Sequence, residues 1–577
     1  MEALLNFSQN LLIHQWSLFF KVLAILILFL LINIYIYDRF VQRSNQLLIN
    51  YPVIGRMRYF FHLLRDPMRQ YFGDETYYDS YEKVDWVNKA SHKKSLMYSF
   101  SLTQPYGLSK PYGQNHNFFR HANFVLNDDE VNSNLSVTFG ERQPYPFVTK
   151  SVIGRSAMSD GSISPEGTRA FAQGAYIGQF PINTGEGSLT SNFLKTHQCS
   201  DNPDENRFLT IKEGTWFAKS VFRVVKILLN EYIAISLYKS MVIRTKEKET
   251  YSFDAKKMLL YRIDWTQPLE FFPQIPLDNI PDIVLQIGSG LYGVKDKDGK
   301  FDGLRYQKVM KFCKMTEIKI AQGAKQTGGK LLAEKVTASV AYNRGVEIGQ
   351  PLYSPNRFPY ASNIEELFDF IGKLQELSEK PVGVKIVIST KENFQEYSKE
   401  IKKRVADGRS YPDFLTLDGG DGGSATAPRE MMSRVGMSIQ NSLDIVVDEL
   451  KKEGVRDKIK LIASEKVLTP DDALELFAYG ADFINIARGF MISAGCIRAR
   501  HCSGAGGHEC PVGLATMDKG KRSKFLVARK SETIANYHEA LIDGIRSLLA
   551  IMGKRDIKEP SKEDLISKQI IDSKLFG

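Results

Sequence analysis

From about residue 380 onward, short apolar runs alternate regularly with helical patterns. Four runs rich in Val, Ile and Leu follow one another along the chain: VGVKIVIS (382–389), DFLTLDG (413–419), KIKLIAS (458–464) and FINIARG (483–489). Helical patterns lie before and between them, at about 364–377, 394–405, 438–453 and 470–478. Near-continuous apolar strands separated by helices are typical of parallel βαβ units, so this region is expected to form a parallel sheet.

The same rhythm extends toward the N-terminus. Earlier strand-like runs are EIKIAQG (317–323), IVLQIGSG (283–290) and SVIGRSAMS (151–159). Together these runs predict an α/β fold, most of a (β/α)₈ barrel between about residues 150 and 530. A doubly wound sheet is the alternative. The barrel is favoured because glycine and polar residues follow the C-terminal ends of many strands, where barrel active sites are built.

Three other regions flank or interrupt the predicted barrel. Residues 50–150 are aromatic and irregular and are expected to form an N-terminal subdomain, and residues 530–577 are expected to form a helical tail. The segment from about 195 to 280 is an insertion with a long helical pattern, in which Lys219, Arg223 and Lys226 recur on an apolar background. Packing of this helix against the barrel is the favoured interpretation, and a helix lying on a membrane is the alternative.

The first fifty residues contain an apolar stretch, 22–37, that extends back to Trp16 and is long enough for one tilted transmembrane helix. A signal peptide fits less well, because no small-x-small cleavage site follows Tyr37. A buried helix is the third interpretation. Four arginines follow the stretch: Arg39, Arg43, Arg56 and Arg58. The positive-inside rule therefore predicts a single-pass anchor (1–45) with the catalytic part in the cytoplasm.

The charge of the chain bears on its partners. The sequence has 76 Lys+Arg and 66 Asp+Glu, a formal net charge of +10. This excess of positive charge suits a soluble part that is held close to an anionic membrane leaflet, although lysines dispersed over the surface are the simpler explanation. Basic residues do not alternate with aromatic residues in a stripe, so nucleic-acid binding is not expected.

Three of the five cysteines, Cys496, Cys502 and Cys510, lie within fifteen residues. In the reducing cytoplasm, clustered thiols are more often metal ligands than disulfides. Three thiolates on one loop followed by proline can hold an iron–sulfur cluster. Zinc with His501 or His508 is the competing metal, but paired C-x2-C knuckles are absent. Buried cysteines without a ligand are the third interpretation.

Polar residues follow the last two predicted strands. Arg488 and Gly489 end FINIARG, while Ser464, Glu465 and Lys466 end KIKLIAS. Loops after the seventh and eighth strands are the usual phosphate site of a barrel, so either a flavin mononucleotide or a phosphorylated substrate would suit them. A structural role for Arg488 is the alternative.

Two glycine-rich loops, 183–188 and 418–424, also follow strand-like runs. Glycine lets the backbone approach a flat ring or a phosphate closely, and Glu186 and Lys385 could carry charge or protons there. Lys385 lies inside an apolar strand, so it requires an anionic partner. Flavin enzymes commonly place such a cation near the ring.

Ten collinear motifs between about 150 and 530 resemble the FMN-binding, iron–sulfur-containing synthase domain of glutamate synthase in its stand-alone form. The motifs are SAMSDGSIS (156–164), NTGEGS (183–188), LQIGSGLYGV (285–294), QGAK…GG (322–329), SPNR (354–357), PVGVKIVIS (381–389), DGGDGGSATAP (418–428), IAS-K (462–466), ARGFM (487–491) and CIRARHC…CPVGLAT (496–516). The resemblance implies an FMN-binding barrel, a [3Fe–4S] cluster, and reduction of 2-iminoglutarate, formed from 2-oxoglutarate and ammonia, to glutamate.

The resemblance also assigns roles to residues. Lys385 is expected near the flavin and the substrate carboxylate, with Glu186 as the second catalytic candidate, and the three cysteines of 496–510 are expected to hold the cluster. The other cofactor-binding residues that it implies lie against the flavin ring or its phosphate: Ala157, Met158, Ser159, Gly422, Gly423, Ser464, Lys466, Arg488 and Gly489.

The sequence departs from the family pattern in several places. Seven residues separate Cys502 from Cys510 where the family usually has four, and Glu465 replaces a glycine at the phosphate loop. The loops 422–425 and 325–329 are altered, and Phe358 stands where a histidine is common. These departures keep two alternatives open: a flavin and iron–sulfur reductase of another acceptor, and a cofactor-poor, membrane-anchored interaction protein.

The electron source is expected to be external. No glutaminase domain and no strand–G-x-G-x-x-G–helix unit for NADPH can be recognised in the sequence. The resemblance therefore implies electrons from a ferredoxin, a reductase subunit or a donor at the membrane.

Overall fold

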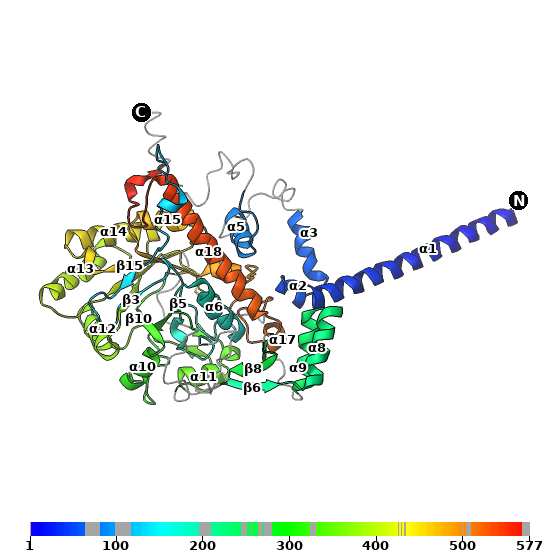
Figure 1. The fold of residues 1–577 in the computed structure, drawn as a ribbon, viewed down its shortest axis with the longest axis horizontal. Helices are drawn as coiled ribbons and strands as arrows, with labels where there is room; N and C mark the ends of the chain where they lie inside the picture. The colour runs from blue at the N-terminus through cyan, green and yellow to red at the C-terminus, as the bar shows by residue number, and fades with distance from the viewer. Residues whose placement is uncertain are drawn as a thin grey trace. The chain divides into compact units, whose positions relative to one another are not determined.

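The structure is a computed structural model that divides into two compact units, residues 1–77 with 211–261 and residues 78–210 with 262–577. Figure 1 shows the fold as a ribbon. The described residues are 2–63, 81–97, 117–194, 209–243, 251–255, 257–263, 269, 280–323, 330–424, 426–427, 430–431, 434–499, 501–503 and 509–567.

Eight parallel strands in the second unit form a closed barrel, in the spatial order β10-β13-β14-β15-β16-β4-β5-β9. The prediction of an α/β barrel is therefore confirmed. In chain order the strands are β4 (Ile153–Arg155), β5 (Ile182–Asn183), β9 (Ile283–Ile287), β10 (Cys313–Lys319), β13 (Val382–Ile386), β14 (Phe414–Asp418), β15 (Lys460–Ser464) and β16 (Phe483–Ile486).

The strands differ from the predicted runs at their ends, and two of these differences concern the site. β10 begins four residues before the predicted run and ends at Lys319, so the last residues of EIKIAQG belong to a loop. β16 ends at Ile486, and Arg488 begins the helix α16 (Arg488–Ser493) rather than ending the strand. β5 is only two residues long, which explains why the strand-like run before the loop 183–188 was not counted among the barrel strands.

Helices cover the outside of the barrel (Figure 1). The four predicted helical patterns are confirmed as α12 (Ile364–Ser378), α13 (Lys391–Ala406), α14 (Ile439–Lys452) and α15 (Pro470–Ala478). Side-chain caps define their starts: the Asn363 side chain accepts a hydrogen bond from Glu366 N at 2.9 Å. The second unit also contains α5 (Tyr81–Ser91), α6 (Pro165–Gly178), α10 (Gly303–Met310), α11 (Ala338–Arg344), α17 (Lys519–Arg522) and α18 (Val527–Met552).

Short antiparallel pairs complete this unit: β1 (Asn117–Phe119) with β17 (Leu565–Ser567), β2 (Thr138–Phe139) with β3 (Phe147–Val148), and β11 (Lys330–Leu331) with β12 (Leu352–Tyr353). The β2–β3 pair places the buried Phe139 against the N-terminal ends of two barrel strands. Its ring lies 5.5 Å from that of Phe414 and 5.7 Å from that of Phe483, both in edge-to-face geometry. Aromatic packing thus fills the end of the barrel opposite the carboxyl ends of the strands.

The first unit joins N-terminal residues to the insertion. It contains α1 (Glu2–Ile36), a π-helical segment (Tyr37–Val41), α2 (Gln46–Asn50), α3 (Met57–Leu63), α8 (Trp216–Leu228) and α9 (Glu231–Val242), beside a sheet of β6 (Leu209–Glu213), β8 (Leu259–Ile263) and β7 (Ser252–Asp254). The helices of the insertion thus form a hairpin that groups with the N-terminal segment, and the packing of this hairpin on the barrel stays a prediction. The parts of the insertion at 195–208 and 244–250 lie outside the described residues.

The helix that includes the predicted anchor is long and apolar enough to cross a membrane. An 18-residue window within Phe19–Val41 has a mean hydropathy of 2.6, and none of that window is buried. Its length and composition would also suit a signal sequence.

The C-terminal helix α18 packs along α6 through a glycine. A Cβ atom on Gly174 would lie 2.5 Å from Cγ2 of Ile534 and 3.0 Å from the carbonyl oxygen of Ser531. These distances leave no room for a methyl group between the helices.

We expect Gly174→Ala to destabilise the protein by about 1–3 kcal/mol, because the added methyl group forces α6 and α18 apart. The measurement is the thermal midpoint Tm of the purified full chain in detergent. Tyr176→Ala, on the same helix but 43% exposed, is the matched control and should leave Tm almost unchanged. Equal Tm values for Gly174→Ala and the wild type would contradict the tight packing.

Candidate active site

Charged side chains meet where the strands of the barrel end. Lys319, the last residue of β10, pairs in register with Lys385 of β13, and Lys385 pairs in turn with Thr416 of β14. Two neighbouring lysines would repel each other in a buried place unless carboxylates balance them. Both have such a partner: Lys385 Nζ lies 3.1 Å from Asp418 Oδ1, and Lys319 Nζ lies 2.6 Å from Glu186 Oε2.

A buried carboxylate inside the barrel, Glu317, joins four strands. It accepts hydrogen bonds from Asn183 Nδ2 at 2.9 Å, Gln286 Nε2 at 2.7 Å and Thr416 Oγ1 at 2.5 Å. These three donors come from β5, β9 and β14, while Glu317 itself lies on β10. An ionised carboxylate is tolerated in such a place only when its lone pairs are satisfied, and here they are.

Lys385 is ionised although it is buried. Burial lowers the pKa of its ammonium group, but the negative charges of Asp418, Glu317 and Glu186 outweigh this effect and leave the pKa raised. The prediction that this lysine needs an anionic partner is thus met by Asp418. A buried, permanently charged cation at the active-site end of a barrel can hold an anionic ligand group.

Glu186 lies on the short helical turn Gly185–Gly187 that follows β5. Its carboxylate packs against Gly288, where a Cβ atom would lie 2.1 Å from Oε1. This contact and the ion pair with Lys319 hold Glu186 beside the ends of β9 and β10. The two predicted catalytic residues, Glu186 and Lys385, are therefore brought to the same end of the barrel.

The loop after β14 lies beside Arg488. Among the described residues, a Cβ atom on Gly423 would have one neighbour within 4 Å, the Nη2 atom of Arg488 at 3.4 Å. The carbonyl oxygen of Gly423 accepts a hydrogen bond from Gln322 Nε2 at 3.2 Å, and the amide of Gly422 donates to Gly419 O at 2.9 Å. The loop after β14 and the Arg488 side chain, which were predicted to belong to one site, thus lie side by side.

The loop after β15 joins the ends of three strands. Ser464 Oγ lies 3.5 Å from Ser156 Oγ, which follows β4, and Lys466 Nζ lies 3.1 Å from Asp421 Oδ2, which follows β14. Lys466 has a φ of 42°, in the left-handed region that glycine adopts more readily. Both predicted phosphate-loop residues therefore lie at the carboxyl ends of the strands.

Glu465, the residue that replaces glycine in the family pattern, caps a helix. Its Oε2 accepts a hydrogen bond from Ile439 N, at the start of α14, at 2.7 Å. Burial raises the pKa of Glu465 to about 7, because desolvation outweighs that hydrogen bond and Asp421 adds repulsion. The side chain is thus only partly ionised at neutral pH, and its repulsion of a nearby phosphate is smaller than a full negative charge would exert.

The three residues predicted to line the flavin ring follow β4. Met158 O accepts a hydrogen bond from Arg155 Nη1 at 3.1 Å, and Ser159 Oγ accepts one from Arg344 Nη2 at 3.4 Å. A Cβ atom on Gly185 would lie 2.7 Å from Ser159 N, so this stretch lies directly against the loop after β5. Ala157 is the remaining member and, like its neighbours, is partly exposed.

Gly489 has a structural reason to be glycine. A Cβ atom there would lie 2.0 Å from the hydroxyl oxygen of Tyr537, which donates a hydrogen bond to Leu468 O at 2.9 Å. The predicted phosphate contact of Gly489 stays a prediction, while its packing against α18 is a second requirement for glycine.

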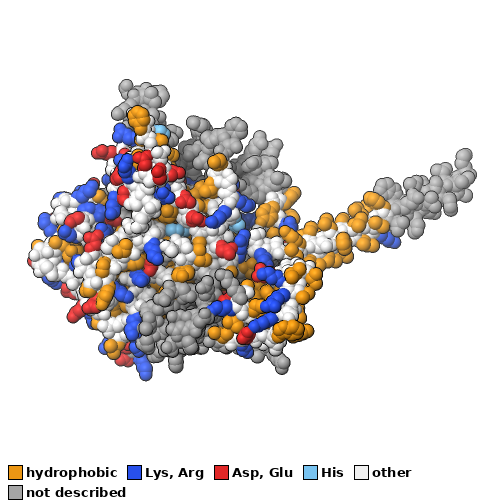
Figure 2. All heavy atoms as spheres, in the orientation of Figure 1, with side chains coloured by type: hydrophobic (Ala, Val, Ile, Leu, Met, Phe, Trp, Pro, Cys, Tyr) orange, Lys and Arg blue, Asp and Glu red, His pale blue; other side chains and the backbone are white. Residues whose placement is uncertain are grey.

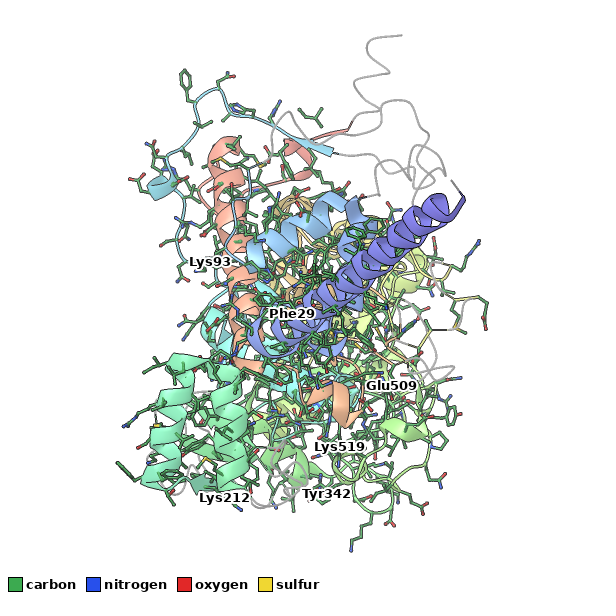
Figure 3. All side chains as sticks on the ribbon, turned by 90° about the vertical axis from the view of Figure 1, so that its right-hand side faces the viewer. Phe29, Lys93, Lys212, Tyr342, Glu509 and Lys519 are labelled. Atoms are coloured by element: carbon green, nitrogen blue, oxygen red, sulfur yellow. The ribbon has the colours of Figure 1, made fainter. Side chains whose placement is uncertain are left out.

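Two of the three clustered cysteines, Cys496 and Cys502, have thiols whose pKa is raised. Burial raises the pKa of the Cys496 thiol to about 12, and the charges of Cys502 and Cys510 add to this shift. Lys335 Nζ donates to the carbonyl oxygen of Cys502 at 2.5 Å and to that of Ala515 at 3.1 Å. Lys335 thereby links Cys502 to Ala515. The Glu509 side chain, labelled in Figure 3, also acts on the charge of Lys335.

Within the described ranges, no three His, Cys, Asp or Glu side chains are arranged to hold a metal ion. The cysteine positions thus do not form a completed metal site in this structure. Most of the unusual gap, residues 504–508 with His508, lies outside the described residues, as do 324–329.

Several site residues were not predicted. Glu317, Lys319 and Gln286 are central to the barrel interior, and Asp418 was considered only as part of a glycine-rich loop. A signal existed in the run EIKIAQG: Glu317 and Lys319 are two residues apart in an apolar strand, so both face the same side. Charged residues on one face of a buried strand indicate a functional or charge-balanced interior.

The family model described as a conserved region in glutamate synthase matches residues 103–555. A glutamate synthase large subunit-like protein, YerD of Bacillus subtilis (strain 168), is 39% identical over 290 residues, which cover 50% of this chain and 54% of that protein. An archaeal-type glutamate synthase (NADPH) of Dehalococcoides mccartyi is 30% identical over 236 residues, which cover 41% of this chain and 43% of that protein. The chain spans about half the length of the curated relatives it matches.

A crystal structure of the monotopic membrane protein (S)-mandelate dehydrogenase overlaps 85% of this chain and 92% of its own, with 11% identity and a TM-score of 0.38. A likeness of this size adds nothing to the barrel already described. The family match, by contrast, extends over far more than half of the sequence and includes all eight barrel strands. The protein therefore belongs to the glutamate synthase family.

Proposed function

We propose that the protein is an FMN-dependent oxidoreductase of glutamate synthase type, which reduces 2-iminoglutarate, formed from 2-oxoglutarate and ammonia, to glutamate. The observation that carries the proposal is the buried, charged Lys385 at the carboxyl end of the barrel, with Arg488 and the loop of Gly423 at the same end. Membership of the family makes this the chemistry to test first.

The residues present suit a flavin mononucleotide. Arg488 beside the open backbone of Gly423 offers a cation and uncrowded amides for a phosphate, and Ser464 and Lys466 would add a hydroxyl and a second charge. The partly exposed residues of 157–159 would lie against the ring. Glu465 is compatible with this arrangement because its raised pKa and its bond to Ile439 reduce its charge near the phosphate.

Bound flavin would supply the hydride that reduces the imine carbon. The chain itself would bind and orient the substrate: Lys385 pairs with a carboxylate of 2-iminoglutarate and stabilises negative charge. Glu186, which pairs with Lys319, would exchange a proton with the substrate nitrogen. The network around Glu317 keeps these side chains in register.

The electrons would come from an external donor, either a ferredoxin or a reductase subunit. This assignment follows from the absence of a recognisable NADPH-binding unit in the sequence. The single-pass anchor, with the catalytic unit in the cytoplasm, would keep the enzyme beside a membrane; it is supported by the exposed, apolar Phe19–Val41 and the arginines that follow.

A [3Fe–4S] cluster on Cys496, Cys502 and Cys510 is the second part of the proposal. Its support is the closeness of the three cysteines, since the charge of Cys510 contributes to the raised pKa of the Cys496 and Cys502 thiols, and the presence of Lys335 beside them. Thiolates on one loop are typical iron–sulfur ligands.

A reductase of another acceptor is the second candidate function. Phe358 supports it, because this residue is buried in an aromatic cluster with Phe370, 5.4 Å between ring centroids, where the family pattern has a histidine. Reduced enzyme that is not reoxidised by 2-oxoglutarate plus ammonia, yet carries flavin, would favour this candidate.

Removing the charge of Lys385 should abolish most activity without loss of the fold. We expect Lys385→Met combined with Asp418→Asn, which avoids an unpaired buried carboxylate, to lower kcat/KM for 2-oxoglutarate plus ammonia roughly 100-fold. The assay uses full-length protein with a chemically reduced viologen donor, and flavin absorbance is recorded in parallel. Lys308→Met, at an exposed lysine of α10, is the control. Wild-type protein without a flavin band would contradict the proposed function itself.

The raised pKa of Glu465 predicts a pH-dependent stability. Its native pKa of about 7 lies above the ordinary value of 4.5 for a glutamate, so the native state binds the proton more tightly and stability falls as pH rises between about 5 and 8. Glu465→Gln keeps an acceptor for Ile439 N and should remove this fall, with a gain over wild type at pH 8 of up to about 3 kcal/mol. Tm measured across this range tests it, and parallel profiles for the two proteins would refute it.

Iron content tests the cysteine assignment. We expect single Cys→Ala changes at 496, 502 and 510 each to remove the bound iron and the electron paramagnetic resonance signal of the oxidised cluster from anaerobically purified protein. Cys313→Ala is the matched control, because Cys313 is a fully buried cysteine of β10 outside the motif. Wild-type protein without iron, or equal iron in all four variants, would show that these cysteines hold no cluster.

A further inference from the structure

The end of the candidate membrane helix is fixed to the insertion. Asp38, fully buried in the π-helical segment, accepts hydrogen bonds from Arg56 Nε at 2.9 Å and from Val53 N at 3.0 Å. A few residues later, Arg43 lies 3.6 Å from Glu231 Oε2 and over the ring of Tyr232 at 5.5 Å, both at the start of α9. The helical hairpin α8–α9 is thus held at the point where α1 ends.

The hairpin has a core of its own and a second set of apolar side chains outside it. Phe222 and Ala218 of α8 pack with Tyr238 of α9 and with the small sheet. Six other apolar residues of α8 and the position after it are strongly exposed: Trp216 (79%), Phe217 (61%), Val224 (54%), Ile227 (82%), Leu228 (73%) and Leu229 (64%). A contiguous exposed group of this kind marks a surface that is covered by something else.

The direction of α8 suits a surface helix. In Figures 1 and 3, α8 and α9 run across the direction of α1. Two labels in Figure 3 help to find them: Phe29 marks α1, and Lys212 marks the foot of the hairpin. In a bilayer that α1 crosses, α8 would therefore lie along the membrane surface. Figure 2 shows apolar side chains along the edge over α8 and α9, with basic side chains beside them.

Charge indicates the kind of lipid. The unit of residues 1–77 and 211–261 has 17 Lys+Arg and 10 Asp+Glu, a net charge of +7, out of +10 for the whole chain. On α8 itself, Arg223 and Lys226 are exposed and Lys219 is partly exposed. Basic residues near a bilayer are attracted to acidic headgroups, each by about 1 kcal/mol.

We propose that α8 is an interfacial helix that inserts its exposed apolar side chains between the headgroups and the upper acyl chains of an acidic leaflet, beside the span formed by α1. The tryptophan at its start and the Ile227–Leu229 end would be buried in lipid, while Arg223 and Lys226 contact lipid phosphates. The protein then holds the bilayer at two places. This inference concerns the membrane-proximal unit and does not depend on the enzymatic proposal.

The test is quenching of Trp216 fluorescence in full-length protein reconstituted in nanodiscs. The discs contain phosphatidylcholine and phosphatidylglycerol, with the phosphatidylcholine brominated either near the headgroup or near the chain end. The difference between wild type and Trp216→Phe isolates the Trp216 signal from the other tryptophans. We expect a blue-shifted Trp216 signal that loses most of its intensity with lipid brominated near the headgroup and much less with lipid brominated at the chain end.

Two matched sets of variants test the two kinds of contact. The quenching should be lost in a triple variant of the basic residues of α8, Lys219→Glu with Arg223→Glu and Lys226→Glu. It should persist in the control, which changes three exposed lysines of the barrel unit: Lys297→Glu, Lys300→Glu and Lys308→Glu. Ile227→Ser with Leu228→Ser should weaken it, and Leu304→Ser with Ile348→Ser, at exposed apolar residues of the barrel unit, is the control. Circular dichroism confirms that each variant is folded.

Three results would overturn the proposal. The first is Trp216 emission that is insensitive to brominated lipid in discs that contain the protein. The second is failure of the full chain to enter discs, which would remove the span on which the surface helix depends. The third is a second copy of the chain that covers Trp216 in place of lipid. It would be seen as cross-linking between the α8 helices of two copies, to the same extent with and without lipid.

Discussion

Charge balance inside a closed barrel is the constraint on which the site depends. Glu317, Lys319, Lys385 and Asp418 lie at or near the carboxyl ends of three adjacent strands, and each would be costly to bury alone. Glu317 is satisfied only because β5, β9 and β14 deliver a donor to it at the same level. A one-residue slip of any of these strands would turn its donor to the other face, so the charge network and the register of the barrel specify each other.

The regular part of the fold could be predicted from local pattern, and the contacts between distant strands could not. The helices α12 to α15 and the last four strands carry strong apolar periodicity and capping residues, so their positions follow from the sequence. β5 has only two residues, so its sequence indicates a strand-like run but no apolar periodicity. The partners of Glu317 lie up to 134 residues away from it and meet only when the barrel closes. Lys385 was recognised because a lysine in an apolar strand is an isolated exception, but its partner had to come from the structure.

Residues of the family pattern turn out to serve packing as well as chemistry. The family resemblance assigns Gly489 to the flavin phosphate, and the absence of a side chain there also leaves room for the hydroxyl of Tyr537 from α18. Glu465, a departure from the pattern, caps α14 through Ile439 N. The insertion likewise has a role that its sequence alone left open: its helices share one compact unit with the N-terminal segment, because Arg43 reaches Glu231 and Tyr232.

The antiparallel pairing of β1 with β17 has a consequence for biosynthesis. The register joins Phe119 to Leu565, so the two strands are roughly 450 residues apart in the chain. At roughly 5–20 residues per second, the ribosome needs on the order of half a minute or more to make that interval. During this time β1 exposes unpaired backbone groups, while the apolar N-terminal helix has long since emerged. A nascent chain recruited early to a membrane would spend this vulnerable period tethered and dilute, away from other unfinished copies.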